Sequence, residues 1–249
     1  MFRFTAQSMV VLTYLVGSTS LLAFTIFLFL GPLNLFPFSL SEPAKLAIDA
    51  SLCLVFFIQH STMIRKTFRN GLMKHVGAHY HGALFTITSG VLLFGLVLLW
   101  QKSSLVLWQA HGVFYWLLRV IFILSIGGMH WGIKSLGSFD AFGIATIIRH
   151  SRSKHSPSSG PLVVKGPYRW VRHPLYFFSL LMFWSHPVLS ADRLLFNILW
   201  TGWIIVGILL EERDMVAYFG DAYREYQSKV PMFVPLRLPL RLRSTSQDH

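Results

Sequence analysis

The chain has 249 residues, of which 53% are hydrophobic and only 13% are charged, and its formal net charge is +12. Soluble domains carry about 25% charged residues, so this composition points to lipid rather than water as the main solvent. The single cysteine, Cys53, excludes an intrachain disulfide and a cysteine metal cluster. A basic chain can bind nucleic acid or an anionic membrane leaflet, and the apolar content favours the leaflet.

Six segments carry enough apolar residues to cross a bilayer, whose hydrocarbon core needs a helix of about 20 residues. They cover residues 9–30, 44–64, 80–100, 112–134, 174–190 and 194–210. The first is longer than the apolar core of a signal peptide, which is the alternative interpretation. The fifth is the weakest, because Ser185-His186-Pro187 interrupts it. This interruption favours a short kinked helix or one arm of a re-entrant hairpin.

The basic residues sort by the loops between these segments. With the N-terminus in the cytoplasm, all but four of the 22 Lys and Arg residues lie in cytoplasmic segments; the exceptions are Lys45, Lys102, Arg193 and Arg119, the last within the fourth span. Cytoplasmic loops are the ones that carry an excess of Lys and Arg. The sequence therefore predicts an all-α integral membrane protein with about six transmembrane helices and both termini in the cytoplasm. The sorting of basic residues by loop also argues against a nucleic-acid partner.

The parts outside the membrane are predicted to be small. The longest loop runs over residues 135–173, and its centre, 151–160, has the composition of a flexible link. Aromatic residues at helical spacing over 214–226 predict a cytoplasmic amphipathic helix that lies on the membrane or caps a site. The prolines of 230–235 exclude regular helix there.

Two polar clusters stand at the ends of the last two apolar segments. Arg172-His173-Pro174 opens the fifth, and Glu211-Glu212 closes the sixth. A helix N-terminus can hold an anionic group, whereas carboxylates at a helix C-terminus oppose the macrodipole and are expected there only with a reason. A hairpin of the two segments would bring both clusters together at the cytoplasmic boundary. The alternatives without a functional site are membrane anchoring by Arg172 and His173, and solvated interfacial charge for Glu211 and Glu212.

The run from Lys165 to Pro235 resembles the isoprenylcysteine carboxyl methyltransferase and phospholipid methyltransferase superfamily. The matching pieces are Gly166-Pro167-Tyr168-Arg169, Arg172-His173-Pro174-Leu175-Tyr176, Glu211-Glu212, Phe219-Gly220 with Tyr223 and Tyr226, and Val230-Pro231-Met232. Gln59-His60-Ser61 with Met63, and Ser138-Phe139-Asp140-Ala141-Phe142-Gly143, resemble the branch that contains bacterial methanethiol S-methyltransferases and NnrU-type proteins. The resemblance implies an integral membrane enzyme that uses S-adenosylmethionine, formed by one domain over 1–249, with four spans in 1–134 and the cofactor-binding core in 135–249.

The resemblance also implies roles for particular residues. The cofactor is expected to be held by Tyr168, His173, Pro174, Leu175, Tyr176, Glu211 and Glu212. Arg172 is expected to orient groups near the reacting centre. His60 is a candidate to favour the thiolate of a thiol acceptor, although a histidine at the end of a span is more often packed. Gln59, Asp140 and Phe177 are candidate acceptor contacts. A structural pair of Asp140 with Arg149 is the alternative, and Phe177 stands where many relatives have glycine.

The expected reaction is direct displacement on the methyl carbon, with a small lipophilic thiol as the preferred acceptor, of the methanethiol to dimethyl sulfide type. A prenylcysteine carboxylate or a phospholipid amine is the alternative acceptor. A non-catalytic or haem-associated membrane protein of the NnrU kind, with His60 and His130 as ligands, is the alternative class. His75, His79 and His81 have a spacing compatible with a metal, but a solvated basic loop is favoured and no metal is predicted.

Overall fold

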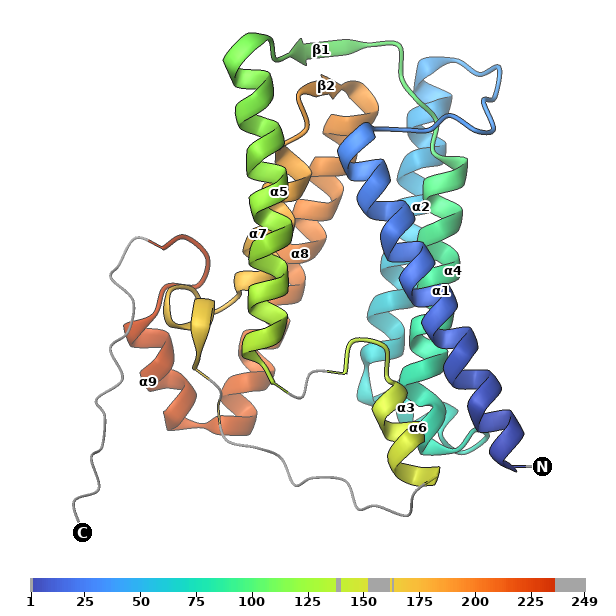
Figure 1. The fold of residues 1–249 in the computed structure, drawn as a ribbon, viewed down its shortest axis with the longest axis vertical. Helices are drawn as coiled ribbons and strands as arrows, with labels where there is room; N and C mark the ends of the chain where they lie inside the picture. The colour runs from blue at the N-terminus through green and yellow to red at the C-terminus, as the bar shows by residue number, and fades with distance from the viewer. Residues whose placement is uncertain (1, 138–139, 152–161, 163, 236–249) are drawn as a thin grey trace. The chain divides into compact units, whose positions relative to one another are not determined.

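The computed structural model describes residues 2–137, 140–151, 162 and 164–235, most of which are helical (Figure 1). The chain divides into two compact units. Unit 1 comprises Met1–Arg119, Asp140–Ser159 and His186–Trp203, and unit 2 comprises Val120–Phe139, Gly160–Ser185 and Ile204–His249. The predicted single domain over 1–249 stays a prediction. Ser138 and Phe139 of the second branch motif, and most of the predicted link over 151–160, lie outside the described residues.

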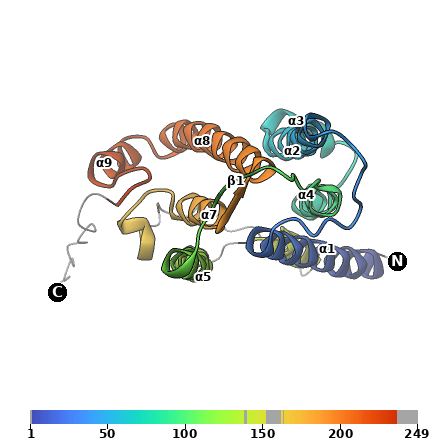
Figure 2. The same cartoon turned by 90° about the horizontal axis from the view of Figure 1, so that it is seen from above.

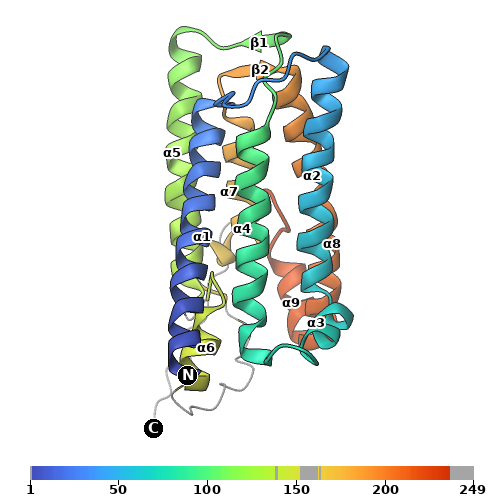
Figure 3. The ribbon, with the colours of Figure 1, turned by 90° about the vertical axis from the view of Figure 1, so that its right-hand side faces the viewer.

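Unit 1 is built on three long helices, α1 (Phe2–Leu30), α2 (Glu42–Ile64) and α4 (His81–Leu99). Helix α4 packs against both α1 and α2 (Figures 2 and 3). A Cβ at Gly90 of α4 would lie only 2.9 Å from Cγ1 of Val16, so this glycine permits the close approach of α1. Small residues play this part in helix pairs within membranes, where apolar burial cannot drive association. The shorter helices of unit 1 are α3 (Lys66–Leu72), η1 (Ala78–Tyr80) and α6 (Ile144–Ser151).

Unit 1 also contains a small sheet that the sequence did not predict. Strand β1 (Val106–Gln109) pairs antiparallel with β2 (Val188–Ser190), with Val106 opposite Ser190 and Gln109 opposite Val188. The hydrogen bond from Ala110 N to Pro187 O, 2.8 Å long, extends the pairing. The sheet places an extended segment at 188–190, directly after the interruption at Ser185-His186-Pro187 that the sequence predicted within this span.

Unit 2 contains parts of α5 (Gly112–Ser135) and α8 (Ala191–Phe219), together with η2 (Gly166–Arg169), α7 (Pro174–Trp184) and α9 (Asp221–Lys229). Glycines on α5 admit the side chains of α7. A Cβ at Gly132 would lie 2.6 Å from Cδ2 of Leu175, and one at Gly128 would collide with the ring of Phe178. Helices α5 and α7 therefore pack closely within this unit.

Five helices among the described residues are long and apolar enough to cross a membrane: Ala6–Leu30, Glu42–Ile64, Ala78–Leu99, Gly112–Ser135 and Ala191–Phe219. They mark an integral membrane protein, as the composition predicted. The remaining predicted span corresponds to α7, which has only 11 residues. The count of six crossings is therefore not established by helix length.

Two boundaries predicted from the sequence were wrong. Helix α8 continues to Phe219, so Glu211 and Glu212 lie inside the helix and not at its C-terminus. The helix macrodipole therefore gives no reason to expect a functional role for this pair. Evidence for such a role has to come from the contacts that the two side chains make. The single amphipathic helix predicted over 214–226 is divided at Gly220 into the end of α8 and the separate helix α9. Residues 230–235 contain no helix, as predicted from their prolines.

Candidate active site in unit 2

The turn Gly166–Arg169 fixes the start of the site. Gly166 has φ +54°, a left-handed conformation that favours glycine, and a Cβ there would collide with Oγ of Ser135 and lie 3.1 Å from Nε1 of Trp131. The buried ring of Pro167 follows within the 3-10 turn. The geometry gives a local reason for Gly-Pro at this point of the chain, because the turn lies against the end of α5.

Backbone hydrogen bonds join the start of α7 to the segment after α9. Arg172 N donates to Pro231 O at 3.0 Å, and His173 N donates to Met232 O at 3.3 Å. Two sequence pieces that are almost 60 residues apart therefore lie side by side. Pro174 then begins α7 at the position where a missing N–H costs nothing.

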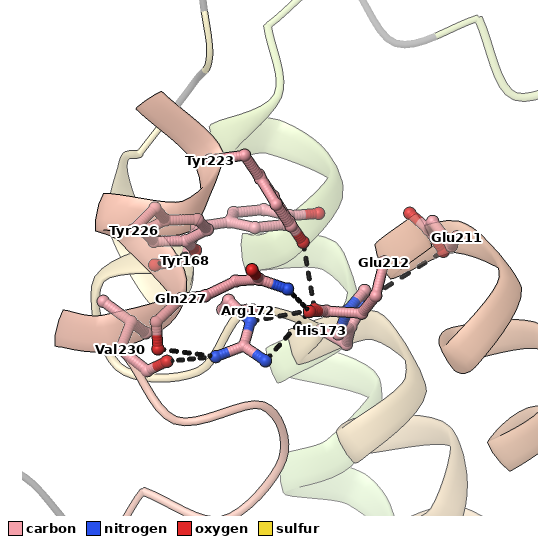
Figure 4. A network of polar contacts seen from close by, with 9 residues as sticks. All are labelled: Tyr168, Arg172, His173, Glu211, Glu212, Tyr223, Tyr226, Gln227 and Val230. Carbon is pink, nitrogen blue, oxygen red and sulfur yellow. Dashed lines mark hydrogen bonds and ion pairs between the residues drawn. The ribbon is translucent and has the colours of Figure 1, made fainter. Parts of the chain in front are cut away.

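Glu212 is the centre of a polar network (Figure 4). The guanidinium of Arg172 donates to it in a fork, Nε to Oε1 at 2.8 Å and Nη2 to Oε2 at 3.0 Å. Nε2 of His173 lies 2.6 Å from Oε1, and the Tyr223 hydroxyl donates to the same oxygen at 3.0 Å. Gln227 Nε2 donates to Oε2. Both carboxylate oxygens are thus occupied by protein donors, and the side chain is only 10% exposed.

The same guanidinium holds α9 against the start of α7. Arg172 Nη1 donates to Gln227 O at 3.1 Å and to Val230 O at 2.5 Å. The turn at Gly220, with φ +58°, lets the chain reverse after α8 so that α9 meets the network. The hydroxyl of Tyr226 donates to Tyr168 O at 2.5 Å, which ties α9 to the 3-10 turn as well.

Apolar packing adds to the hydrogen bonds that hold α9 in place. Tyr223, Tyr226 and Val230 form a buried cluster, and the partly buried residues packed against it are Leu162, Val164, Met215, Val216 and Phe219. Burial, followed by the charge of Glu212, raises the pKa of Tyr223. The phenol is therefore neutral at physiological pH and serves as a hydrogen-bond donor to the carboxylate.

Glu211 has different surroundings from its neighbour. Its side chain is 43% exposed, and Oε2 lies 3.9 Å from Nδ1 of His173. Burial, together with the charge of Glu211, raises the pKa of Tyr168 to about 12. Tyr176 lies within electrostatic reach of the same carboxylate and hydrogen-bonds it. Glu211 thus has one tyrosine donor in an aromatic setting, whereas four donor side chains hold Glu212.

A cavity of about 440 Å³ opens beside this network, and its lining is mainly apolar and aromatic. It is lined by Leu136, Leu162, Tyr168, Arg172, His173, Pro174, Leu175, Tyr176, Glu211, Met215, Phe219, Tyr223 and Tyr226. All predicted cofactor residues except Glu212 are in this lining. The sequence did not assign Met215, Phe219 or Gln227 to the site, although the aromatic spacing over 214–226 indicated a cap.

The other predicted site residues have contacts of their own. Phe177 contacts Phe178 and Phe233, with ring centroids 5.4 and 6.4 Å away, and does not line the cavity. In unit 1, Asp140 accepts the N–H groups of Ile144 and Ala145 at 3.1 and 2.7 Å, at the first turn of α6. Arg149, its suggested partner, donates instead to Ala145 O.

Gln59 and His60 lie near the end of α2 in unit 1. Gln59 Nε2 donates to Thr88 Oγ1 of α4 at 2.9 Å. The ring of His60 lies 4.8 Å from that of Phe85 and 5.1 Å from that of Trp203. Its Nδ1 is buried, with no hydrogen-bond partner among the described residues. Gln59 therefore links two helices, and His60 lies in an aromatic setting.

Comparison with known proteins identifies the family. A model of the phospholipid methyltransferase family matches residues 115–222. A methanethiol S-methyltransferase from a Pseudomonas species is 35% identical over 203 residues, covering 78% of this chain and 75% of the relative. The chain belongs to the phospholipid and isoprenylcysteine methyltransferase superfamily. The family match includes the site from the turn Gly166–Arg169 to the turn at Gly220, and it ends before Tyr223.

Two more relatives from this superfamily differ in how much of the chain they cover. A methanethiol S-methyltransferase from Pseudomonas deceptionensis is 33% identical over 209 residues, 84% of this chain and 78% of the relative. A protein-S-isoprenylcysteine O-methyltransferase from Schizosaccharomyces pombe is 36% identical over 78 residues, 30% of this chain and 33% of the relative. No solved structure matches the chain.

Proposed function

We propose that this chain is an S-adenosylmethionine-dependent methyltransferase that methylates a small lipophilic thiol, with methanethiol as the first acceptor to test. The observation that carries the proposal is the convergence of the separated segments 168–176 and 211–226 on one cavity, which the carboxylate of Glu211 lines. The superfamily membership supports methyl transfer. The length of the matches to methanethiol S-methyltransferases supports the thiol.

The residues around the cavity fit the cofactor. Its volume of about 440 Å³ lies in the range of small-molecule sites, roughly 300–1,000 Å³. Helix α7 begins at the wall, and a helix N-terminus favours an anionic group such as an amino-acid carboxylate. Glu211 provides a negative charge for a cationic group, and the tyrosine rings provide flat surfaces for an adenine or a sulfonium.

Bound S-adenosylmethionine supplies a methyl carbon whose bond to sulfur breaks, leaving the electron pair on that sulfur, as the acceptor thiolate forms the new bond. The protein contributes alignment, which alone can be worth about 7–11 kcal/mol. We assign Glu211, Tyr168 and Tyr176 to direct contact with the cofactor. We assign Arg172 and Glu212 to positioning, because their polar atoms are engaged with each other and with α9.

His60 remains our candidate to favour the thiolate. Free cysteine has a pKa near 8.5, and a simple alkanethiol such as methanethiol is a weaker acid still, so it is protonated at neutral pH and needs a proton acceptor. Replacing His60 with Gln should lower the methylation rate strongly at pH 7 and weakly at a pH near the pKa of the acceptor thiol, where the thiol ionises unaided. An equal loss at both pH values would assign His60 to packing against Phe85 and Trp203 instead.

We also propose that the chain crosses the membrane six times, with both termini, α9 and the cavity on the cytoplasmic side. The 11 residues of α7 rise about 16 Å, roughly half of a hydrocarbon core of about 30 Å, so a full crossing would also use the non-helical residues 185–190 that follow. Ser185, Pro187 and Ser190 are buried, as non-helical backbone at membrane depth must be. The distribution of basic residues sets the orientation.

Cysteine labelling tests this topology. In a Cys53→Ser background, Ser104→Cys should react with a membrane-impermeant maleimide added to whole cells, and Ser228→Cys should react only after the cells are opened. Both serines are exposed, so accessibility within the fold does not limit the reaction. Labelling of both positions in intact cells would contradict the proposed orientation.

Prenylcysteine and phospholipid amines are the competing acceptors, favoured by the description of the matching family and by the yeast relative. Membranes containing the protein should be incubated with methyl-labelled cofactor and each acceptor. We expect labelled dimethyl sulfide from methanethiol, lost in Glu211→Gln and kept in the exposed control Glu225→Gln. Transfer to a prenylcysteine or a lipid amine alone would overturn the acceptor. Absence of both transfer and cofactor binding would overturn the enzyme assignment.

A further inference from the structure

The adjacent residues Glu211 and Glu212 differ in exposure and in hydrogen bonding. The carboxylate of Glu212 is 10% exposed and receives donors from four side chains, so no oxygen is left for a ligand. The carboxylate of Glu211 is 43% exposed and lines the cavity. Only one of the two can therefore meet a cofactor directly, and it is Glu211.

The fixed charges around the cavity do not cancel. Arg172 is the one Lys or Arg residue in the described lining, and its guanidinium donates to Glu212 and to two backbone carbonyls. The charge of Arg172 is thus matched by that of Glu212. The charge of Glu211 faces the cavity with the imidazole of His173 at 3.9 Å. A ligand group near Glu211 therefore meets a carboxylate that no Lys or Arg of the described lining neutralises.

The kind of cation that suits Glu211 follows from its neighbours. Tyr168 and Tyr176 line the same cavity as this carboxylate, Tyr176 hydrogen-bonds it, and the rest of the lining is mostly apolar. An ammonium group has three N–H donors and requires an acceptor for each. A sulfonium has no donor, so a single carboxylate with aromatic faces satisfies it through charge and cation–π attraction.

We infer that Glu211, flanked by Tyr168 and Tyr176, recognises the positive sulfur of S-adenosylmethionine, so that the site prefers the charged cofactor to its neutral product. The inference rests on the proposed function. Transfer of the methyl group leaves its bonding electrons on the sulfur, which becomes a neutral thioether, and the attraction to Glu211 is lost at that moment. S-adenosylhomocysteine is then the weaker ligand, and its release is favoured.

The size of the preference follows from general electrostatics. An opposite charge within about 4–6 Å shifts an ionisation equilibrium by 1–3 pKa units, a factor of about 10 to 1,000. Solvent screens a carboxylate that is 43% exposed, so the lower end applies. We expect S-adenosylmethionine to bind about tenfold more tightly than S-adenosylhomocysteine, and the ratio to fall as salt rises.

Isothermal titration calorimetry of the purified full chain in detergent measures both ligands directly. In Glu211→Gln, affinity for S-adenosylmethionine should fall about tenfold and affinity for S-adenosylhomocysteine less than threefold. The matched control is Glu225→Gln on α9, whose carboxylate is 66% exposed and pairs with Lys229, and it should change neither affinity. Thermal melting of each variant verifies that the fold is kept.

Three outcomes are decisive. Equal weakening of both ligands in Glu211→Gln would overturn the inference and assign this carboxylate to an ammonium or a ribose, which the two ligands share. Wild-type protein that binds S-adenosylhomocysteine as tightly as S-adenosylmethionine would overturn it as well, without any variant. Failure of wild-type protein to bind either ligand would instead overturn the proposed function.

Discussion

Replacing Arg172 with Met should destabilise the protein strongly. Arg172 and Glu212 form a forked ion pair with both side chains 10% exposed. Removal of one partner from a buried pair costs about 3–5 kcal/mol, because the remaining charge stays buried. Glu212 keeps its contacts with His173, Tyr223 and Gln227, which favours the lower end, whereas two carbonyls also lose their donor. We therefore expect a loss of about 3–4 kcal/mol.

Thermal unfolding in detergent, followed by intrinsic fluorescence, measures this loss. A change of 1 kcal/mol moves the melting temperature of a chain of this size by about 2–4 °C, so Arg172→Met should lower it by roughly 6–16 °C. The control is Arg224→Met on α9, whose pair with Asp221 is 64% and 96% exposed. An exposed pair is worth about 0–1 kcal/mol, so the control should shift by no more than about 4 °C.

A double variant tests the physical reason. Arg172→Met combined with Glu212→Leu leaves no unpaired buried charge, so it should be more stable than the sum of the single losses by about 0.5–3 kcal/mol. It should still bind cofactor poorly, because α9 has lost its tie to α7. Equal melting temperatures for Arg172→Met and Arg224→Met, or strict additivity in the double variant, would refute the reasoning.

Further predictions concern backbone conformation and hydrogen bonding. Gly166→Ala should lower the free energy of unfolding by about 1–3 kcal/mol, because φ is +54° at this position. The control is Gly207→Ala, whose new Cβ would have nothing within 4 Å, and it should leave stability unchanged or raise it by up to about 1 kcal/mol. Equal melting temperatures for the two variants would contradict this prediction. Tyr226→Phe should lower the free energy of unfolding by about 1 kcal/mol, because the hydrogen bond from its hydroxyl to Tyr168 O is lost. An unchanged melting temperature would show that this hydrogen bond does not stabilise the fold.

Local composition predicted most of the helical architecture. The span expected over 112–134 is Gly112–Ser135, and that over 44–64 is Glu42–Ile64. Apolar runs predict these limits because lipid selects composition along the whole helix. Hydropathy marks where lipid ends, however, and not where a helix ends, so α8 continues past its polar residues to Phe219. Gly220 is a usual helix-stop signal and could have located that end.

Other features depend on contacts that the sequence does not encode locally. Strand β1 has a partner about 80 residues away, and four exposed residues alone do not predict the pairing. The motif pieces predicted that Arg172, His173 and the glutamates meet. They did not predict that Glu212 is engaged and Glu211 is open, because adjacent helical residues point about 100° apart and the packing of α9 decides which one is covered.

The central claim is that the cavity of unit 2 holds S-adenosylmethionine. Ultraviolet cross-linking of radiolabelled cofactor to the purified protein, followed by peptide mapping, tests it most directly. We predict label on peptides that contain residues 166–176 or 211–226, prevented by excess unlabelled cofactor and reduced in Glu211→Gln. Label that excess cofactor does not prevent, or label found only on peptides from unit 1, would contradict the account.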